Sequence, residues 1–103
     1  MSDNRKWIVD YDKGVPEQLR ADFQNGKITA ENIEIIRIWV ADIEERGLKF
    51  AQNKADWRDH ELRGKWEDHR AISFSHSGRL IYRVEDHRLI VKVIRITPDH
   101  NHK

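Results

Sequence analysis

The residues best suited to acid–base chemistry lie in the second half of the chain. The six histidines all follow residue 53, at His60, His69, His76, His87, His100 and His102. Imidazole has an ordinary pKa of about 6.5, so histidine can accept and donate protons near neutrality. Residues 54–103 also carry 11 Lys/Arg against 8 Asp/Glu, whereas residues 1–53 carry 8 against 10. This asymmetry predicts that an anionic partner contacts the C-terminal half.

Composition excludes several other kinds of site. The chain has no cysteine, which rules out disulfides, thiolate zinc sites and a cysteine nucleophile. No spacing of His, Asp and Glu resembles a closed metal site, so we expect neither a metal nor another cofactor. The apolar patch at residues 7–9 is far too short for a signal-peptide core or a membrane span. We therefore expect a cytoplasmic protein without membrane contacts.

Apolar spacing in the first half predicts the elements that must support this chemistry. A length of 103 residues allows one small domain, residues 1–103. Residues 7–11 form an apolar stretch short enough for a strand. Pro16 then favours the first turn of a short helix ending at 25–26. Thr29 is a candidate N-cap for a longer helix, whose apolar stripe runs from Ile33 to Ile43 before Gly47 ends it.

In the second half the apolar period changes from that of a helix to that of a strand. Ile72 and Phe74 alternate with serines, residues 77–78 are typical of a hairpin turn, and residues 80–84 return from it. The last strand, 89–96, is apolar at nearly every position, as in strands covered on both faces. The predicted fold class is α+β: a short N-terminal strand, two helices, then a C-terminal antiparallel meander forming a twisted sheet with helices on one face.

The segment from 59 to 84 carries a more specific pattern. It contains D-H-x-L-x-G-x-W, then a strand that opens with arginine, a turn, and R-L-I-Y-R-V. This order resembles the RelE/ParE toxin superfamily, whose fold is RelE-like and similar to microbial ribonucleases. The matching residues are Asp59, His60, Leu62, Gly64, Trp66, Arg70, Arg79, Leu80, Ile81, Tyr82, Arg83 and Val84. The YafQ-like branch is nearest, because it also ends with an arginine close to a histidine, as in Arg95 and His100.

The chain departs from the YafQ-type pattern at three places. Ser73 stands where that branch usually has histidine, and the acidic residue expected near Ser77 is missing. The spacing between Arg95 and His100 is also longer. Part of that branch's catalytic set is therefore absent or moved.

The resemblance implies the toxin of a type II toxin–antitoxin system, a metal-independent, ribosome-dependent endoribonuclease (mRNA interferase) that inhibits translation. Its partners would be a cognate antitoxin, the ribosome and mRNA. Cleavage through the 2′-hydroxyl needs a base, an acid and cations around the phosphate. We expect His60 and His100 as the acid–base pair, and Arg70 and Arg95 as the cations, gathered at one sheet edge.

Residues with a supporting role in RNA binding have structural alternatives. The expected RNA contacts are Lys65, His69, Arg79 and Tyr82. Tyr82 could equally pack in the core, and Arg79 and Arg83 could be structural partners of Glu85 or Glu67. His60 could have a purely structural role and hold the loop before the sheet in place.

Two other functions remain open at this point. A ParE-like toxin would share the fold and inhibit DNA gyrase without cutting RNA. A catalytically inactive relative would survive as a binding module, which the serines at 73 and 77 would allow.

Overall fold

The computed structural model describes residues 6–98. Its elements are β1 (Ile8–Tyr11), α1 (Val15–Gln24), α2 (Ala30–Arg46), α3 (Leu48–Asn53), β2 (His60–Glu61), β3 (Arg70–Ser73), β4 (Arg79–Glu85) and β5 (Ile90–Thr97). Three short 3-10 turns, at Ala55–Trp57, Gly64–Trp66 and Asp86–Arg88, lie in the connections. The predicted α+β order is confirmed. The structure adds a third helix, α3, and the two-residue strand β2.

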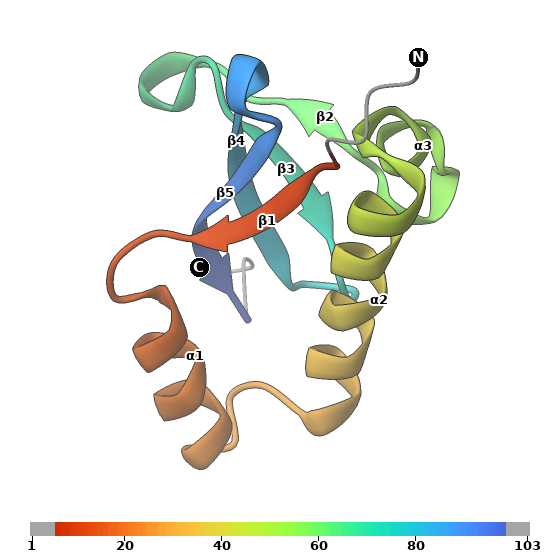
Figure 1. Ribbon diagram of the computed structural model, residues 1–103. Coiled ribbons are helices and arrows are strands. Elements are labelled where there is room, and N and C mark those ends of the chain that lie inside the picture. The colour runs from red at the N-terminus through yellow and green to blue at the C-terminus, as the bar shows by residue number, and fades with distance from the viewer. Residues whose placement is uncertain (1–5, 99–103) are drawn as a thin grey trace.

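The strands form one mixed sheet in the order β1-β5-β4-β3-β2 (Figure 1). The meander β3-β4-β5 is antiparallel, as predicted, and β2 extends it antiparallel at one edge. At the other edge β1 pairs parallel to β5. Parallel pairing needs a long crossover, and here most of the chain lies between the two paired strands. The N-terminal strand therefore closes the sheet next to the C-terminal one.

Local signals explain where the two main helices begin. Thr29 caps α2: its Oγ1 accepts the Asn32 amide at 3.0 Å, and Asn32 Oδ1 accepts the Thr29 amide at 3.3 Å. This reciprocal pair satisfies two backbone donors that a helix start leaves unpaired. Pro16 lies in the first turn of α1, where its missing N–H costs nothing. Both predicted helix starts are confirmed.

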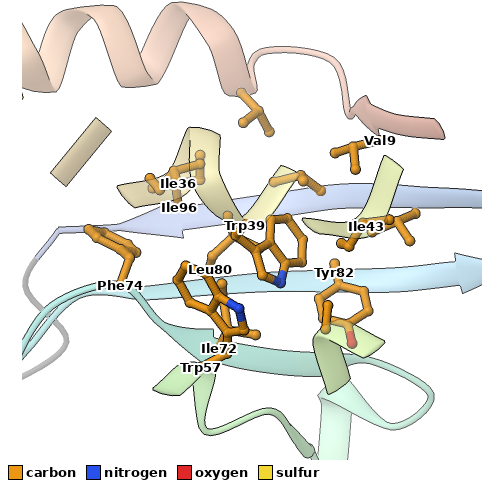
Figure 2. Packing of buried hydrophobic residues seen from close by; sticks show 14 of the residues in the cluster. Val9, Ile36, Trp39, Ile43, Trp57, Ile72, Phe74, Leu80, Tyr82 and Ile96 are labelled. Atoms are coloured by element: carbon orange, nitrogen blue, oxygen red, sulfur yellow. The ribbon is translucent and has the colours of Figure 1, made fainter. Parts of the chain in front are cut away.

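The core fills the space between the helices and one face of the sheet (Figure 2). Trp39 of α2 and Tyr82 of β4 are both 0% exposed, and their ring centroids lie 5.4 Å apart. On β5, Val91 and Val93 are buried, whereas the residues that flank them, Ile90, Lys92 and Ile94, are only half-buried. The prediction that the last strand is covered on both faces is therefore wrong. Helices cover one face, and the other is available for a site.

Candidate active site

A row of four residues crosses the sheet on the face away from the helices. His60 of β2 pairs with Ala71 of β3, which pairs with Ile81 of β4, which pairs with Arg95 of β5. Directly opposed residues in a sheet share a face, and none of these four belongs to the cluster packed against the helices. Three strand spacings place the Cα atoms of His60 and Arg95 about 14 Å apart.

This face carries several other side chains, and we call it the open face. It consists of the strand residues that alternate with the core positions: Ile8, Asp10, His60, Ala71, Ser73, Arg79, Ile81, Arg83, Glu85, Ile90, Lys92, Arg95 and Thr97. Four of these side chains are Arg or Lys and two are acidic. With neutral histidine, the open face is therefore net positive, as the sequence predicted for the C-terminal half.

A β-bulge decides that Arg95 belongs to the open face. Val93 pairs with Tyr82 on the core face, and Arg95, two residues further on, pairs with Ile81 on the opposite face. Strict alternation would have returned Arg95 to the core side. The register shift between Ile81 and Tyr82 absorbs one extra residue, which turns Arg95 outward and Ile96 into the core.

The orientation of the His60 ring is suited to base catalysis. Its Nδ1 lies 2.9 Å from the carbonyl oxygen of Arg58. A carbonyl only accepts hydrogen bonds, so Nδ1 carries the proton in this contact and Nε2 is the basic nitrogen of the neutral ring. His60 is exposed at the sheet edge. The arrangement leaves a basic nitrogen on an exposed side chain.

Two cations on the open face are held by acids. Arg83 Nη2 lies 3.2 Å from Glu85 Oε2, and Lys92 Nζ lies 3.2 Å from Asp10 Oδ2. Arg95, in contrast, is exposed near the end of β5. Lys92 was missed as a site candidate, although a lysine between Val91 and Val93 is itself a sign that one face of this strand is not buried.

Arg79 is directed back onto its own turn. Its Nη1 donates to the carbonyl oxygens of Ser75, His76 and Gly78 at 3.4, 3.3 and 2.9 Å. The guanidinium thus organises the turn between β3 and β4. Arg79 is thus a structural residue of this turn and does not form the predicted ion pair with Glu85 or Glu67; Arg83 is the strand arginine that contacts Glu85.

Arg70 and Tyr82 lie on the opposite side from the His60 row. They pair with each other across β3 and β4, one position away from the Ala71–Ile81 pair, and therefore share the helix-covered face. Tyr82 is completely buried, which leaves no ring face for a base. Arg70 Nε donates to Asp59 Oδ1 at 2.5 Å. The expected grouping of Arg70 with His60 and Arg95 on one surface is not found.

Lys65 and His69 belong to the segment between β2 and β3. Lys65 is exposed on a 3-10 turn, and the His69 ring lies edge-on to Trp66, with centroids 5.3 Å apart. The Leu62 amide donates to the His69 carbonyl at 3.0 Å, which extends the ladder between the two strands. His69 therefore falls on the same face as Ala71, two residues away.

The remaining histidines divide into two groups. His76 and His87 are exposed in turns, as predicted. His100 and His102 lie outside the described residues 6–98. Within that range no group of three His, Asp or Glu side chains could hold a metal ion. None of the described helices is long and apolar enough to cross a membrane.

Comparison with known proteins relates this geometry to a set of solved structures. No protein-family model and no curated protein sequence matches the chain. YafQ from E. coli matches at a TM-score of 0.67 with 14% identity over 88% of this chain and 91% of the other. The E. coli DinJ–YafQ toxin–antitoxin complex matches at 0.66, with 16% identity over 89% and 91%. The YoeB–YefM complex from Staphylococcus aureus matches at 0.64, with 15% identity over 95% and 100%. The chain has the fold of these YafQ and YoeB structures, as the motif resemblance predicted.

Proposed function

We propose that the chain is the toxin of a type II toxin–antitoxin system and inhibits translation as a ribosome-dependent mRNA endoribonuclease. One observation carries the proposal: His60 and Arg95 occupy one cross-strand row on the open face. The fold shared with YafQ and the DinJ–YafQ complex, together with the motifs from Asp59 to Val84, supports it.

In the proposed reaction, His60 Nε2 takes the proton from the RNA 2′-hydroxyl. The resulting oxygen attacks the adjacent phosphorus, the bond to the 5′-oxygen breaks, and a 2′,3′-cyclic phosphate forms. Arg95 would bind the phosphate, whose negative charge a planar guanidinium can hold through two oxygens. We assign protonation of the leaving oxygen to His100, which lies outside the described residues. None of these roles uses a metal ion.

The proposed partners follow from the charge of the open face and from the neighbours. The solved complexes DinJ–YafQ and YoeB–YefM pair a protein of this fold with a second protein. We propose that this chain likewise has a cognate antitoxin. The net positive open face suits the phosphates of mRNA, and the ribosome would present that mRNA in its decoding site.

The test uses the purified full chain, freed of antitoxin, with ribosomes carrying a defined mRNA. We expect primer extension to show new mRNA ends within the decoding site, unchanged by a metal chelator and absent with His60→Ala. Intact mRNA together with inhibited DNA gyrase supercoiling would instead identify a ParE-like toxin. If the mRNA stays intact and gyrase supercoiling is also unaffected, the result would favour an inactive binding module.

A further inference from the structure

A cluster of four polar side chains lies under the sheet edge that carries His60. Asp59 accepts the Arg70 Nε–H at Oδ1 and the Tyr82 hydroxyl at Oδ2, both at 2.5 Å. Gln52 of α3 donates to the Tyr82 hydroxyl oxygen at 3.2 Å. The Asp59 side chain is 0% exposed. One buried carboxylate thus joins β3, β4 and, through Tyr82, α3.

We propose that Asp59 is a positioning residue: by binding Arg70 and Tyr82 at once, it holds β2 in place and so sets His60 on the open face. This inference rests on the proposed role of His60 as the base. Asp59 itself would not touch the RNA, since its carboxylate lies on the helix-covered side of the sheet.

The shortness of β2 makes such an anchor necessary. The strand has two residues and two ladder pairs, His60 with Ala71 and Glu61 with Arg70, and one further bond, from the Leu62 amide to the His69 carbonyl, continues the ladder. Strands usually have five or six residues, so this ladder alone is a weak restraint. Both residues of β2 are exposed, and neither can contribute core packing. The buried carboxylate immediately before the strand supplies the missing restraint.

The backbone carries this restraint to the imidazole. Arg58, the residue before Asp59, has left-handed φ and ψ angles of 52° and 41°. Its carbonyl oxygen is the acceptor for His60 Nδ1 at 2.9 Å. Asp59 therefore stands between the carbonyl and the ring that it orients. If the Asp59 side chain is released, both the strand and this contact are free to shift.

The hydrogen-bond directions in the cluster require a carboxylate. The Tyr82 hydroxyl accepts from Gln52, so its own proton points at Asp59 Oδ2. An asparagine at position 59 would direct its NH2 group, which is a donor, at either the Arg70 N–H or the Tyr82 O–H, which are donors as well. Burial, followed by the hydrogen bond to Asp59, also raises the pKa of Tyr82 above its ordinary value. The hydroxyl therefore remains a donor at neutral pH.

The first test compares Asp59→Asn with Glu61→Gln in the full chain. Glu61 contacts the same arginine, Arg70, at 3.5 Å, but its side chain is 82% exposed. Long-range proton–nitrogen NMR spectra, recorded at a pH at which imidazole is neutral, report which His60 nitrogen carries the proton. We expect the Nδ1–H form in the wild type and in Glu61→Gln, and its loss in Asp59→Asn. An unchanged His60 tautomer in folded Asp59→Asn would overturn the proposal.

Kinetics provides the second readout. Misplacement of a catalytic group by about 1 Å can cost about 100-fold in rate, so we expect Asp59→Asn to lower kcat to that extent with little change in KM. An equal loss in Glu61→Gln would refute a specific role for Asp59. A wild-type chain that cuts no RNA would refute the proposed nuclease function, whereas the tautomer measurement would still decide the positioning role.

If Asp59→Asn does not fold, the variant Tyr82→Phe tests whether Asp59 positions His60. This variant removes one of the two hydrogen bonds to Asp59 and keeps the contact with Arg70. We expect a partial loss of the Nδ1–H form of His60 and a smaller drop in kcat. Wild-type values for both in folded Tyr82→Phe would count against the anchor.

Discussion

His60 Nδ1 donates to the carbonyl oxygen of Arg58 at 2.9 Å, which leaves Nε2 as the basic nitrogen of the neutral ring. The two residues are separated only by Asp59, whose side chain is buried on the other side of the sheet. The exposed imidazole is therefore oriented by the carbonyl of Arg58, and the proposed anchor for the backbone between them is the buried side chain of Asp59.

Removing this imidazole should stop cleavage. We expect His60→Ala to lower the single-turnover rate on ribosome-bound mRNA by about 100-fold or more, because a positioned base contributes at least that factor. The control is His87→Ala, which changes an exposed histidine in the turn Asp86–Arg88. Similar rates for both variants would show that His60 is not the base.

Arg95 should matter for both binding and rate. We expect Arg95→Ala to reduce cleavage by about 100-fold, as for loss of one preorganised donor, and to lower the salt dependence of RNA binding by about one charge. The control Arg37→Ala removes the same charge from α2, where Arg37 lies 3.8 Å from Glu34 on an exposed surface. Equal effects of the two substitutions would mean that only the overall charge matters.

The two tyrosines should make the fold sensitive to alkali. Burial raises the pKa of Tyr11 and of Tyr82 above the ordinary value of 10.0. The folded state thus disfavours the ionised form, so this contribution to stability is complete below pH 10 and is lost as the pH rises through the folded values.

Absorbance of the ionised phenol measures this effect directly. We expect it to appear at higher pH in the native protein than in the protein unfolded by denaturant, and the free energy of unfolding to fall above about pH 10. Tyr82→Phe should weaken that fall. The expectation would be contradicted if the tyrosines ionised at the same pH in the native protein as in the unfolded protein.

Gly78 should not tolerate a side chain. A Cβ at this position would lie 2.5 Å from Phe74 Cε1 and 2.6 Å from Ser75 Oγ, and Phe74 is buried in the core. We expect Gly78→Ala to lower the free energy of unfolding by about 1–3 kcal/mol, the usual cost of overpacking. Chemical denaturation measures this, with Ser77→Ala as the control from the same turn. A loss no greater than that of Ser77→Ala would show that the turn can relax.

Much of the fold could be predicted because its signals are local. The helix cap at Thr29, Pro16 in the first turn of α1 and the alternation of Ile72 with Ser73 each follow from the chemistry of a few neighbouring residues. Helix α3 was missed because its six residues form too short a segment for a clear apolar period. The parallel pairing of β1 with β5 was likewise not predicted, since it joins opposite ends of the chain.

The candidate site was predicted only in part. His60 and Arg95 were identified by type and motif, and the structure brings them into one row. Arg70 and Tyr82 came from the same motif but lie on the other face, where they bind Asp59. A motif gives the order of residues along the chain and does not state which face each one occupies.

The sequence by itself determined the kinds of groups available and most of the elements that carry them, because cap, turn and periodicity signals act over a few residues. Only the tertiary structure decided which groups meet. Side chains alternate between faces, so a single extra residue reverses the outcome, and the bulge after Val93 brings Arg95 opposite Ile81 instead of into the core. That bulge depends on register with β4 and has no signature in the sequence of β5 alone.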